Sequence, residues 1–383
     1  VNVPIGFAAL AVVTKTLHLR HTRLDHRIDW AGAALLSLSL VPLLLVAEQG
    51  REWGWGSTNA IICYVIGVVA AIGFFWQEHR MGEEAILPLA MFRNKTVGVS
   101  SIASVLIGVA MFGGLAALPL YLQIVKGATP TEAGLLLLPM TLGIMIGSIL
   151  SGQIISRTGR YRVFPIVGSA LLTISLFIFH YVAYDTPLWQ TMIVMTMFGV
   201  GLGFNFQPLT LAVQNAVPPQ QIGVATSTAT FTRQIGGTLG TAVFLSILFS
   251  TASEKITTAL AAAVPTQEFQ AALADPANAA VAEQFAAAQS GGGAATSVLS
   301  DSSFLTGLDE RLAKPFLIGF SEAMDLVFLT GSAVMVLGFL VMLMLPNVEL
   351  RKSASYGQRE NDGAPSDADA ANDVDDAAVI AHP

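Results

Sequence analysis

Eight apolar runs, each close to 20 residues long, recur along this chain of 383 residues. An α-helix needs about 20 predominantly apolar residues to cross the hydrocarbon core of a bilayer. Composition agrees with this reading, because 53% of the residues are hydrophobic and only 12% are charged. A soluble globular domain has about 25% charged residues. The chain is therefore predicted to be an all-α, polytopic membrane protein.

The predicted spans have approximate bounds. They lie near residues 31–47, 60–76, 97–122, 133–155, 163–183, 188–212, 222–249 and 322–345. A ninth apolar run begins at Val1 and reaches Lys15, which is too short for a complete crossing. The sequence also does not begin with Met. We expect that it starts inside a longer protein and that residues 1–17 are a truncated transmembrane helix.

The loop charges predict the orientation. When the loops are assigned alternately to the two sides, one side carries far more basic residues than the other. These are Lys15, Arg20, Arg23, Arg27, Arg80, Arg93, Lys95, Arg157, Arg160, Arg162, Arg351, Lys352 and Arg359. The short loops of the other side carry only Arg51 and Lys126. The positive-inside rule then places the first group, and the C-terminus, in the cytoplasm.

Two segments interrupt the apolar pattern. Residues 250–320 are rich in alanine and are predicted to form an extracytoplasmic loop, in which alanine favours short helices. Residues 347–383 carry eight acids against three basic residues and little apolar bulk. This composition predicts an acidic, disordered cytoplasmic tail.

Arg233 is the most unusual residue within the apolar spans. An arginine at the centre of a membrane helix costs about 2.5 to 3.5 kcal/mol on insertion scales, so it is expected to face a wet cavity or a partner. A structural role remains open, in which the side chain pairs with helix ends or reaches the cytoplasmic face. Small residues four apart predict close helix packing, whether static or sliding. They are Gly143, Gly147, Ser151, Gly199, Gly203, Gly236 and Gly240.

Several motifs resemble the major facilitator superfamily, and specifically its drug:proton antiporter family with fourteen helices. The matching segments, in chain order, are Val1–Gly6, Asp29–Gly32, Gly50–Trp55, Thr129–Leu135, Gly152–Arg162, Gln214–Pro218, Gly223–Thr226 and Arg233–Gly240. Their order resembles helices six to fourteen of that family. The resemblance implies that the N-terminal half, including the first helix with its usual essential acid, lies outside this chain.

This resemblance implies a domain organisation. Residues 1–17 would be the truncated last helix of the N-terminal bundle, and 18–95 a linker with two extra transmembrane helices. Residues 96–249 and 321–346 would form the C-terminal six-helix bundle. The segment 250–320 would be the outer loop and 347–383 the tail.

The resemblance also implies a transporter that alternates around a midplane site. Candidate substrate or gating residues are Arg233, Gln234, Asn205, Gln207 and Asp325. Interhelical hydrogen bonds are an alternative role for Asn205, Gln207 and Gln234. Asp325 is either part of a proton route or an acid at a helix N-terminus. A cytoplasmic gating loop is expected with Gly152, Arg157, Gly159 and Arg160, whose arginines alternatively anchor the loop at the membrane surface.

The predicted function is proton-coupled export of hydrophobic or cationic small molecules by alternating access, from a multi-pass position in the plasma membrane. No cofactor, metal or nucleic-acid partner is expected, the energy source being the proton gradient. The other expected partners are the bilayer and the missing N-terminal bundle. An enzyme is not predicted, because the sequence has no zinc-binding HExxH motif and its six histidines are scattered. The alternatives are a non-transporting sensor or scaffold that uses the outer loop, or an exporter of a specific metabolite, siderophore or lipid.

Overall fold

The computed structural model describes residues 2–16, 29–82, 85–278 and 308–346, and every regular element in these ranges is helical. This confirms the predicted all-α membrane protein. The elements are α1 (Asn2–Thr16), α2 (Trp30–Trp53), α3 (Thr58–Met81), η2 (Leu89–Arg93), α4 (Lys95–Leu120), η3 (Tyr121–Val125), α5 (Pro130–Leu136), α6 (Leu138–Thr158), α7 (Val163–Phe179), α8 (Leu188–Asn215), η4 (Pro219–Gln221), α9 (Ile222–Ala263), α10 (Gln267–Leu273), η5 (Pro276–Asn278) and α13 (Glu310–Leu343).

Within the described ranges, seven helical segments are long and apolar enough to cross a membrane. The remaining predicted span, 163–183, corresponds to α7, an apolar helix of 17 residues. At 1.5 Å per residue α7 is about 25 Å long, close to the lower limit for crossing a bilayer. The predicted tail 347–383 and parts of the predicted linker and outer loop lie outside the described residues.

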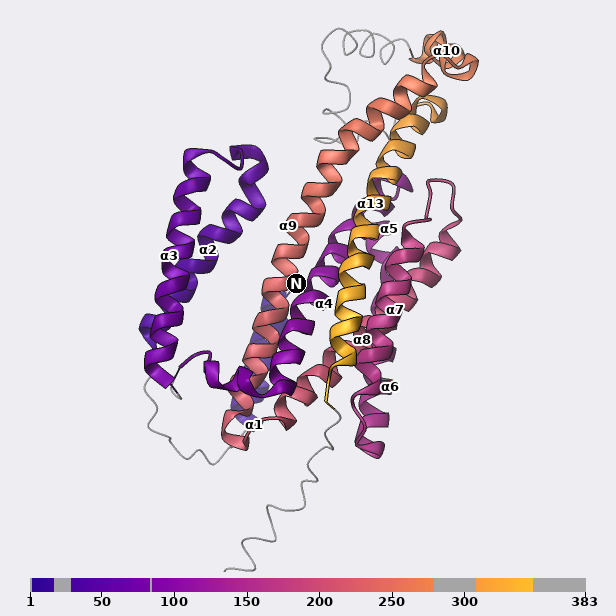
Figure 1. The fold of residues 1–383 in the computed structure, drawn as a ribbon. Coiled ribbons are helices and arrows are strands. Elements are labelled where there is room, and N and C mark those ends of the chain that lie inside the picture. The colour runs from indigo at the N-terminus through magenta and orange to yellow at the C-terminus, as the bar shows by residue number, and fades with distance from the viewer. Residues whose placement is uncertain (1, 17–28, 83–84, 279–307, 347–383) are drawn as a thin grey trace, which may run out of the picture.

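Helices α4, α6, α7, α8, α9 and α13 pack into one bundle (Figure 1). In this bundle α4 packs along α9 and α6 packs along α8, while α7 lies between α8 and α13. Helix α13 also contacts α4 and α9. We call the end of the bundle where α8 passes into α9 the basic end, because the turns there carry Arg93, Lys95, Arg157, Arg160 and Arg162.

Glycines allow the two closest helix pairs. A Cβ atom at Gly147 of α6 would lie 2.7 Å from the carbonyl oxygen of Val200 in α8. Added Cβ atoms at Gly199 and Gly203 would likewise collide with the backbone of α6, and those at Gly236 and Gly240 with the backbone of α4. The predicted close packing through small residues is confirmed for these glycines.

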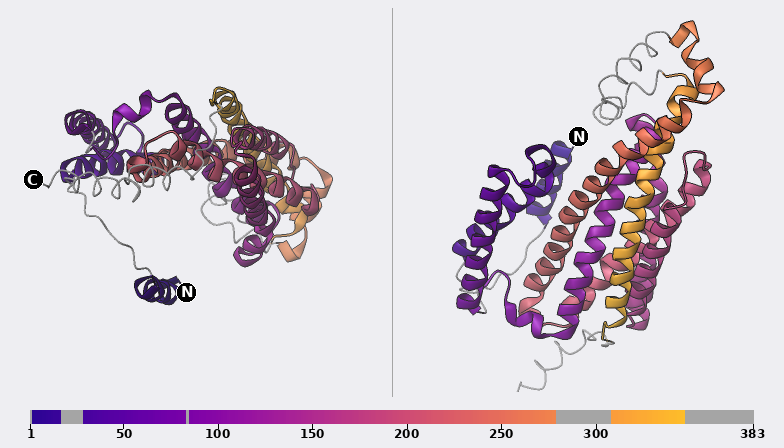
Figure 2. Two further views of the ribbon diagram at one scale, coloured as in Figure 1. Left: turned by 90° about the horizontal axis from the view of Figure 1, so that it is seen from below. Right: turned by 45° about the horizontal axis from the view of Figure 1, so that its top comes forward.

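Helices α2 and α3 pack mainly against each other and stand beside α9 (Figure 1). Asp29 caps α2, its carboxylate accepting a hydrogen bond from the Gly32 amide at 2.8 Å and another from the Gln77 side chain at 3.0 Å. The same aspartate therefore fixes both the start of α2 and the end of α3. Helix α1 lies apart from the other helices (Figure 2, left), and its apolar side chains such as Val3 and Phe7 are exposed.

The predicted outer loop is largely helical where the structure describes it. Helix α9 does not end near residue 249 but continues to Ala263, and α13 begins at Glu310 and not near residue 322. The two helices stay paired beyond the bundle, through buried Ile256 and Phe316 and an ion pair of 3.3 Å between Lys255 and Glu322. We call this part, residues 251–278 and 308–321, the projection. Alanine, the strongest helix former, sustains its helices where bulky apolar residues run out.

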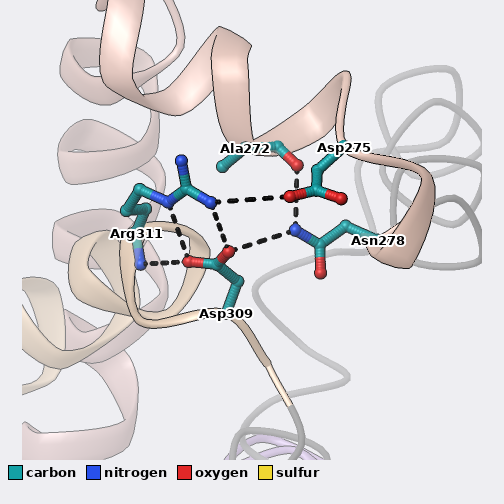
Figure 3. A network of polar contacts seen from close by, with 5 residues as sticks. All are labelled: Ala272, Asp275, Asn278, Asp309 and Arg311. Carbon is teal, nitrogen blue, oxygen red and sulfur yellow. Dashed lines mark hydrogen bonds and ion pairs between the residues drawn. The ribbon is translucent and has the colours of Figure 1, made fainter.

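A polar network closes the tip of the projection (Figure 3). The guanidinium of Arg311 donates two hydrogen bonds to Asp309, at 3.0 and 2.7 Å, and lies 3.9 Å from a carboxylate oxygen of Asp275. The side-chain amide of Asn278 donates to Asp309 and to the Ala272 carbonyl. Because Arg311 stabilises the carboxylate, the pKa of Asp309 is held well below its usual range.

Candidate functional site

Arg233 lies in the membrane-spanning part of α9, half-buried, and its guanidinium carbon is 4.9 Å from the centre of the Phe206 ring in α8. No carboxylate in the described part of the chain forms an ion pair with it. A cation over an aromatic face is attracted by the ring quadrupole, and the attraction strengthens when both groups are desolvated. The ring thus takes the place that an acid would have in an ion pair.

Asn205 does not meet Arg233. It is completely buried, and its side-chain amide donates to the Gly201 carbonyl of the same helix at 2.7 Å. The same amide group lies against Gly168 of α7, while the side-chain oxygen has no hydrogen-bond partner. Asn205 therefore belongs to the contact between α7 and α8. The neighbouring Phe206 is the residue of α8 that reaches Arg233.

Gln207 and Gln234 are exposed on α8 and α9, and neither side chain forms a hydrogen bond within the described residues. Gln234 is part of a row of exposed polar side chains on α9, which we call the α9 polar stripe: Ser227, Thr230, Gln234 and Thr238. Intervals of three and four residues place them on one face of the helix. Sequence reasoning missed the three hydroxyl residues, although this spacing was visible.

The hydroxyls of the stripe are satisfied by their own helix. Ser227 donates to the Gly223 carbonyl at 2.7 Å, and Thr230 donates to that of Thr226 at 3.0 Å. Such bonds to the carbonyl four residues earlier keep a hydroxyl within a helix without a partner on another helix. The amide of Gln234 has no equivalent contact, so the stripe still presents an unpaired polar group.

Asp325 is not at a helix N-terminus. It lies 15 residues after Glu310, about 22 Å along α13, so the stabilisation of an acid by the first turn of a helix does not apply. The alternative that assigned Asp325 to a helix start is wrong, because α13 begins in the projection. A ring nitrogen of His180, at the end of α7, is 3.2 Å from the Asp325 carbonyl oxygen. The charged groups that act on its carboxyl group are His180, Glu322 and Lys255.

The loop between α6 and α7 is shorter than the gating-loop motif. Gly152 and Arg157 lie within α6, and Gly159 ends that helix with a φ of +68°, which favours glycine. Arg157 and Arg160 are exposed. Arg162 instead makes the contact that holds the loop, donating to the Leu343 carbonyl at the end of α13 at 2.9 Å. Of the four residues predicted for the gating loop, Gly159 is a helix cap and Arg157 and Arg160 are exposed cations. The contact that joins the loop to the bundle is made by Arg162.

Comparison with known proteins places the chain among membrane transporters. Residues 30–241 match the model of the Major Facilitator Superfamily. The chain is 37% identical to a tetracycline resistance determinant of Streptomyces rimosus, over 84% of this chain and 92% of that protein. It is 30% identical to an uncharacterized MFS-type transporter of Mycobacterium tuberculosis, over 91% of this chain. Multidrug resistance protein 3 of Bacillus subtilis is 31% identical over 60% of this chain.

The matched length differs between these relatives. The alignments cover 47% of the mycobacterial protein and 45% of the Bacillus protein, so the chain spans about half the length of these two relatives.

Proposed function

The chain belongs to the major facilitator superfamily of membrane transporters, and from this membership we propose that it exports drug-like, amphipathic small molecules. The names of the similar proteins, a tetracycline resistance determinant and a multidrug resistance protein, support the substrate class. Within the molecule, the observation that carries the proposal is an uncompensated arginine beside an aromatic ring and an exposed polar stripe, all on membrane-spanning helices.

These polar groups are costly against lipid. An arginine near the middle of a span, or an unpaired amide such as Gln234, is tolerated where it lines a water-filled cavity or meets another protein surface. Arg233, Phe206 and the α9 polar stripe lie on two adjacent helices, α8 and α9. We propose that they line the substrate path of a transporter with alternating access.

The charge of this site narrows the substrate class. Arg233 has no described acid beside it, so it repels a purely cationic substrate and attracts an acidic or electron-rich group. Phe206 adds apolar and aromatic surface beside Arg233. Amphipathic molecules that carry an acidic group beside fused or aromatic rings fit this site better than the cationic molecules that the sequence also allowed.

For energy coupling we propose proton entry, with Asp325 as a proton-binding group of this bundle. The carboxyl group lies mid-helix in α13, and His180 reaches the same helical turn from α7. We further propose that the basic end faces the cytoplasm, together with the C-terminus, because basic residues gather in its turns.

Transport by inverted membrane vesicles tests the export proposal. The vesicles come from cells that express the complete gene, and uptake of tetracycline is followed after a proton gradient is imposed. Arg233→Ala is expected to reduce uptake at least about tenfold, since the contact of its guanidinium with the Phe206 ring is worth about 2 kcal/mol. Arg93→Ala, which removes an exposed arginine outside the candidate site and the predicted gating loop, is the matched control. Absence of gradient-driven uptake by the unmodified protein, for tetracycline and for a panel of amphipathic acids, would reject the proposal.

Asp325→Asn separates coupling from substrate binding. The variant is expected to lose gradient-driven uptake while keeping exchange of labelled for unlabelled tetracycline without a gradient. Glu310→Gln, at the start of the same helix, removes an exposed acid and serves as control. If Asp325→Asn keeps gradient-driven uptake at the unmodified rate, the proton passes elsewhere.

A scaffold is the second candidate, and the ordered projection favours it. Helices α9, α10 and α13 form an outward extension held by the Asp309 and Arg311 network. If the protein is a scaffold, shortening the projection abolishes the resistance of the cells. Transport in vesicles is then either unchanged by the shortening or already absent from the unmodified protein. The export proposal predicts that vesicle transport accounts for the resistance of the cells.

A further inference from the structure

A pocket lies at the basic end of the bundle, away from Arg233. Its volume is about 390 Å³, within the range of small-molecule sites. The end of α3 and the η2 segment form one wall, through residues such as Leu89 and Met91. The turn between α8 and α9 forms the other, through Val217 and Pro218. The side-chain amide of Asn94 joins the two walls by donating to the Ala216 carbonyl at 3.0 Å.

One buried carboxylate belongs to the lining of this pocket. Glu78 is only 1% exposed, and one of its oxygens accepts a hydrogen bond from the Leu87 amide at 2.9 Å. The other oxygen is buried and has no hydrogen-bond partner in the described part of the chain. An ionised carboxylate in this position is costly unless a cation or donor compensates it. The carboxylate of Asp29, also buried, acts on Glu78 as a like charge and makes the lack of a cation more costly.

Two helix ends add to the negative potential. Helix α3 ends at Met81 and helix α8 ends at Asn215, and the residues that follow each end, Gly82 and Ala216, line the pocket. The C-terminal end of a helix carries about half a negative charge from its free carbonyl groups. Among the residues that the structure describes, no lysine or arginine lines the pocket. The N-termini of α4 and α9, which follow the lining residues Asn94 and Gln221, carry the opposite partial charge and offset these two C-termini, so the preference of the pocket for a cation rests on the carboxylate of Glu78.

We propose that this pocket binds the ammonium group of an amphipathic organic cation, with Glu78 as its counter-charge. The apolar body of the ligand packs against Leu89, Met91 and Val217. Glu78, His79 and Gly82 lie at the end of α3, whereas Met91 packs with Val97 and Val217 of the bundle, so a bound ligand bridges α3 and the bundle. The site differs in charge from the path beside Arg233, which repels cations. It is thus a site for a bound modulator and not for the exported substrate.

Binding of tetraphenylphosphonium to the complete protein in detergent micelles tests this site directly. Glu78→Gln keeps an acceptor for the Leu87 amide and removes the charge, and it is expected to weaken binding at least about tenfold. Ala216→Trp fills the pocket and is expected to abolish binding. Arg233→Ala and Glu132→Gln, an exposed acid, should leave it unchanged. Tetraphenylborate, which has the same shape and the opposite charge, should not compete.

The proposal is overturned if Ala216→Trp and a folded Glu78→Gln variant both bind tetraphenylphosphonium like the unmodified protein, or if tetraphenylborate competes equally. Thermal unfolding of each variant shows whether it is folded. If Glu78→Gln is not folded, Ala216→Trp alone provides the answer.

A lipid ammonium headgroup and a soluble cation are distinguished in nanodiscs. Weaker apparent binding with phosphatidylethanolamine than with phosphatidylglycerol identifies the lipid as occupant, and equal binding identifies a soluble cation. The assay needs no transport, so its outcome is independent of the export proposal.

Discussion

The guanidinium carbon of Arg233 lies 4.9 Å from the centre of the Phe206 ring, and this contact joins α9 to α8 within the bundle. A desolvated contact of this kind is worth about 2 kcal/mol. Phe206→Leu removes the ring but keeps apolar volume, so it is expected to reduce export by about tenfold, since each 1.36 kcal/mol is a factor of ten in rate. Phe206→Tyr keeps the aromatic face and should retain most activity. Initial rates in inverted vesicles measure both effects.

Phe204→Leu is the matched control on the same helix. Phe204 packs edge-on against Phe164 of α7 with 5.5 Å between ring centres, so the same substitution removes an aromatic contact without touching Arg233. It should lower thermal stability and leave the export rate per folded molecule unchanged. Equal losses of export in the two leucine variants would show that the contact between Phe206 and Arg233 has no specific role.

The α9 polar stripe predicts a pattern of thiol accessibility. Cys63 is the only cysteine of this chain, so Cys63→Ser, together with replacement of any cysteine that the complete protein has outside this chain, gives a background without thiols. In that background, Thr230→Cys and Thr238→Cys are expected to react with a membrane-impermeant thiol reagent if the stripe lines a water-filled path. Leu239→Cys and Val243→Cys, exposed on a different face of α9, should stay unlabelled because that face meets lipid. Labelling at all four positions to the same extent would contradict the path.

The sequence predicted the spans because transfer from water to lipid is a property of composition, which a run of about 20 residues displays directly. It did not predict where helices end. Hydropathy stops α9 at the first polar residues near Ser250, while its backbone continues to Ala263 on alanine propensity and on packing against α13. Asp325 was misplaced relative to the helix start for this reason. It follows that the length of a helix and the length of its membrane crossing need separate evidence.

The site was predicted only in part. Arg233 stood out because one charge in an apolar span is costly wherever it points. The sequence did not show whether Asn205 or Phe206 faces α9. Adjacent residues of a helix point about 100° apart, and the sequence does not say which of these directions meets α9. The structure shows Asn205 facing α7 and Phe206 facing Arg233. Side-chain direction on a helix of mixed polarity is set by its neighbours, and these were unknown before the fold.

Gly147 and Gly152 lie on the same helix and are predicted to respond differently to one added methyl group. At Gly147 the Cβ atom would lie 2.7 Å from a carbonyl oxygen of α8, whereas at Gly152 nothing lies within 4 Å. Gly147→Ala is therefore expected to cost about 1 to 3 kcal/mol of stability, the usual range for overpacking. Gly152→Ala should be neutral or slightly stabilising, since alanine is the better helix former. Thermal unfolding in detergent measures both, and similar melting temperatures would contradict the close packing of α6 and α8.

Arg162 is predicted to hold the C-terminal turn of α13. Its guanidinium donates to the Leu343 carbonyl at 2.9 Å, and a cation at a helix C-terminus stabilises it by about 0.3 to 1 kcal/mol. Arg162→Ala should speed amide hydrogen exchange in the last turn of α13, whereas Arg160→Ala, an exposed arginine of the same loop, should not. If both variants exchange like the unmodified protein, the contact does not order the helix end.

The network at the tip of the projection predicts a loss of order in acid. The pKa of Asp309 is depressed by its hydrogen bonds to Arg311, so its stabilising effect is complete above the unfolded pKa of about 3.9 and is lost as the pH falls below that value. Hydrogen exchange at the start of α13, corrected for the intrinsic pH dependence of amides, should stay constant from pH 7 to 5 and rise below pH 4. Asp309→Asn should exchange faster already at pH 7 and lose this extra acid sensitivity. Subtracting the exchange rate of Asp309→Asn from that of the unmodified protein removes the contribution of other acids such as Glu322. If this difference in exchange rate does not change with pH, the assigned role of Asp309 is refuted.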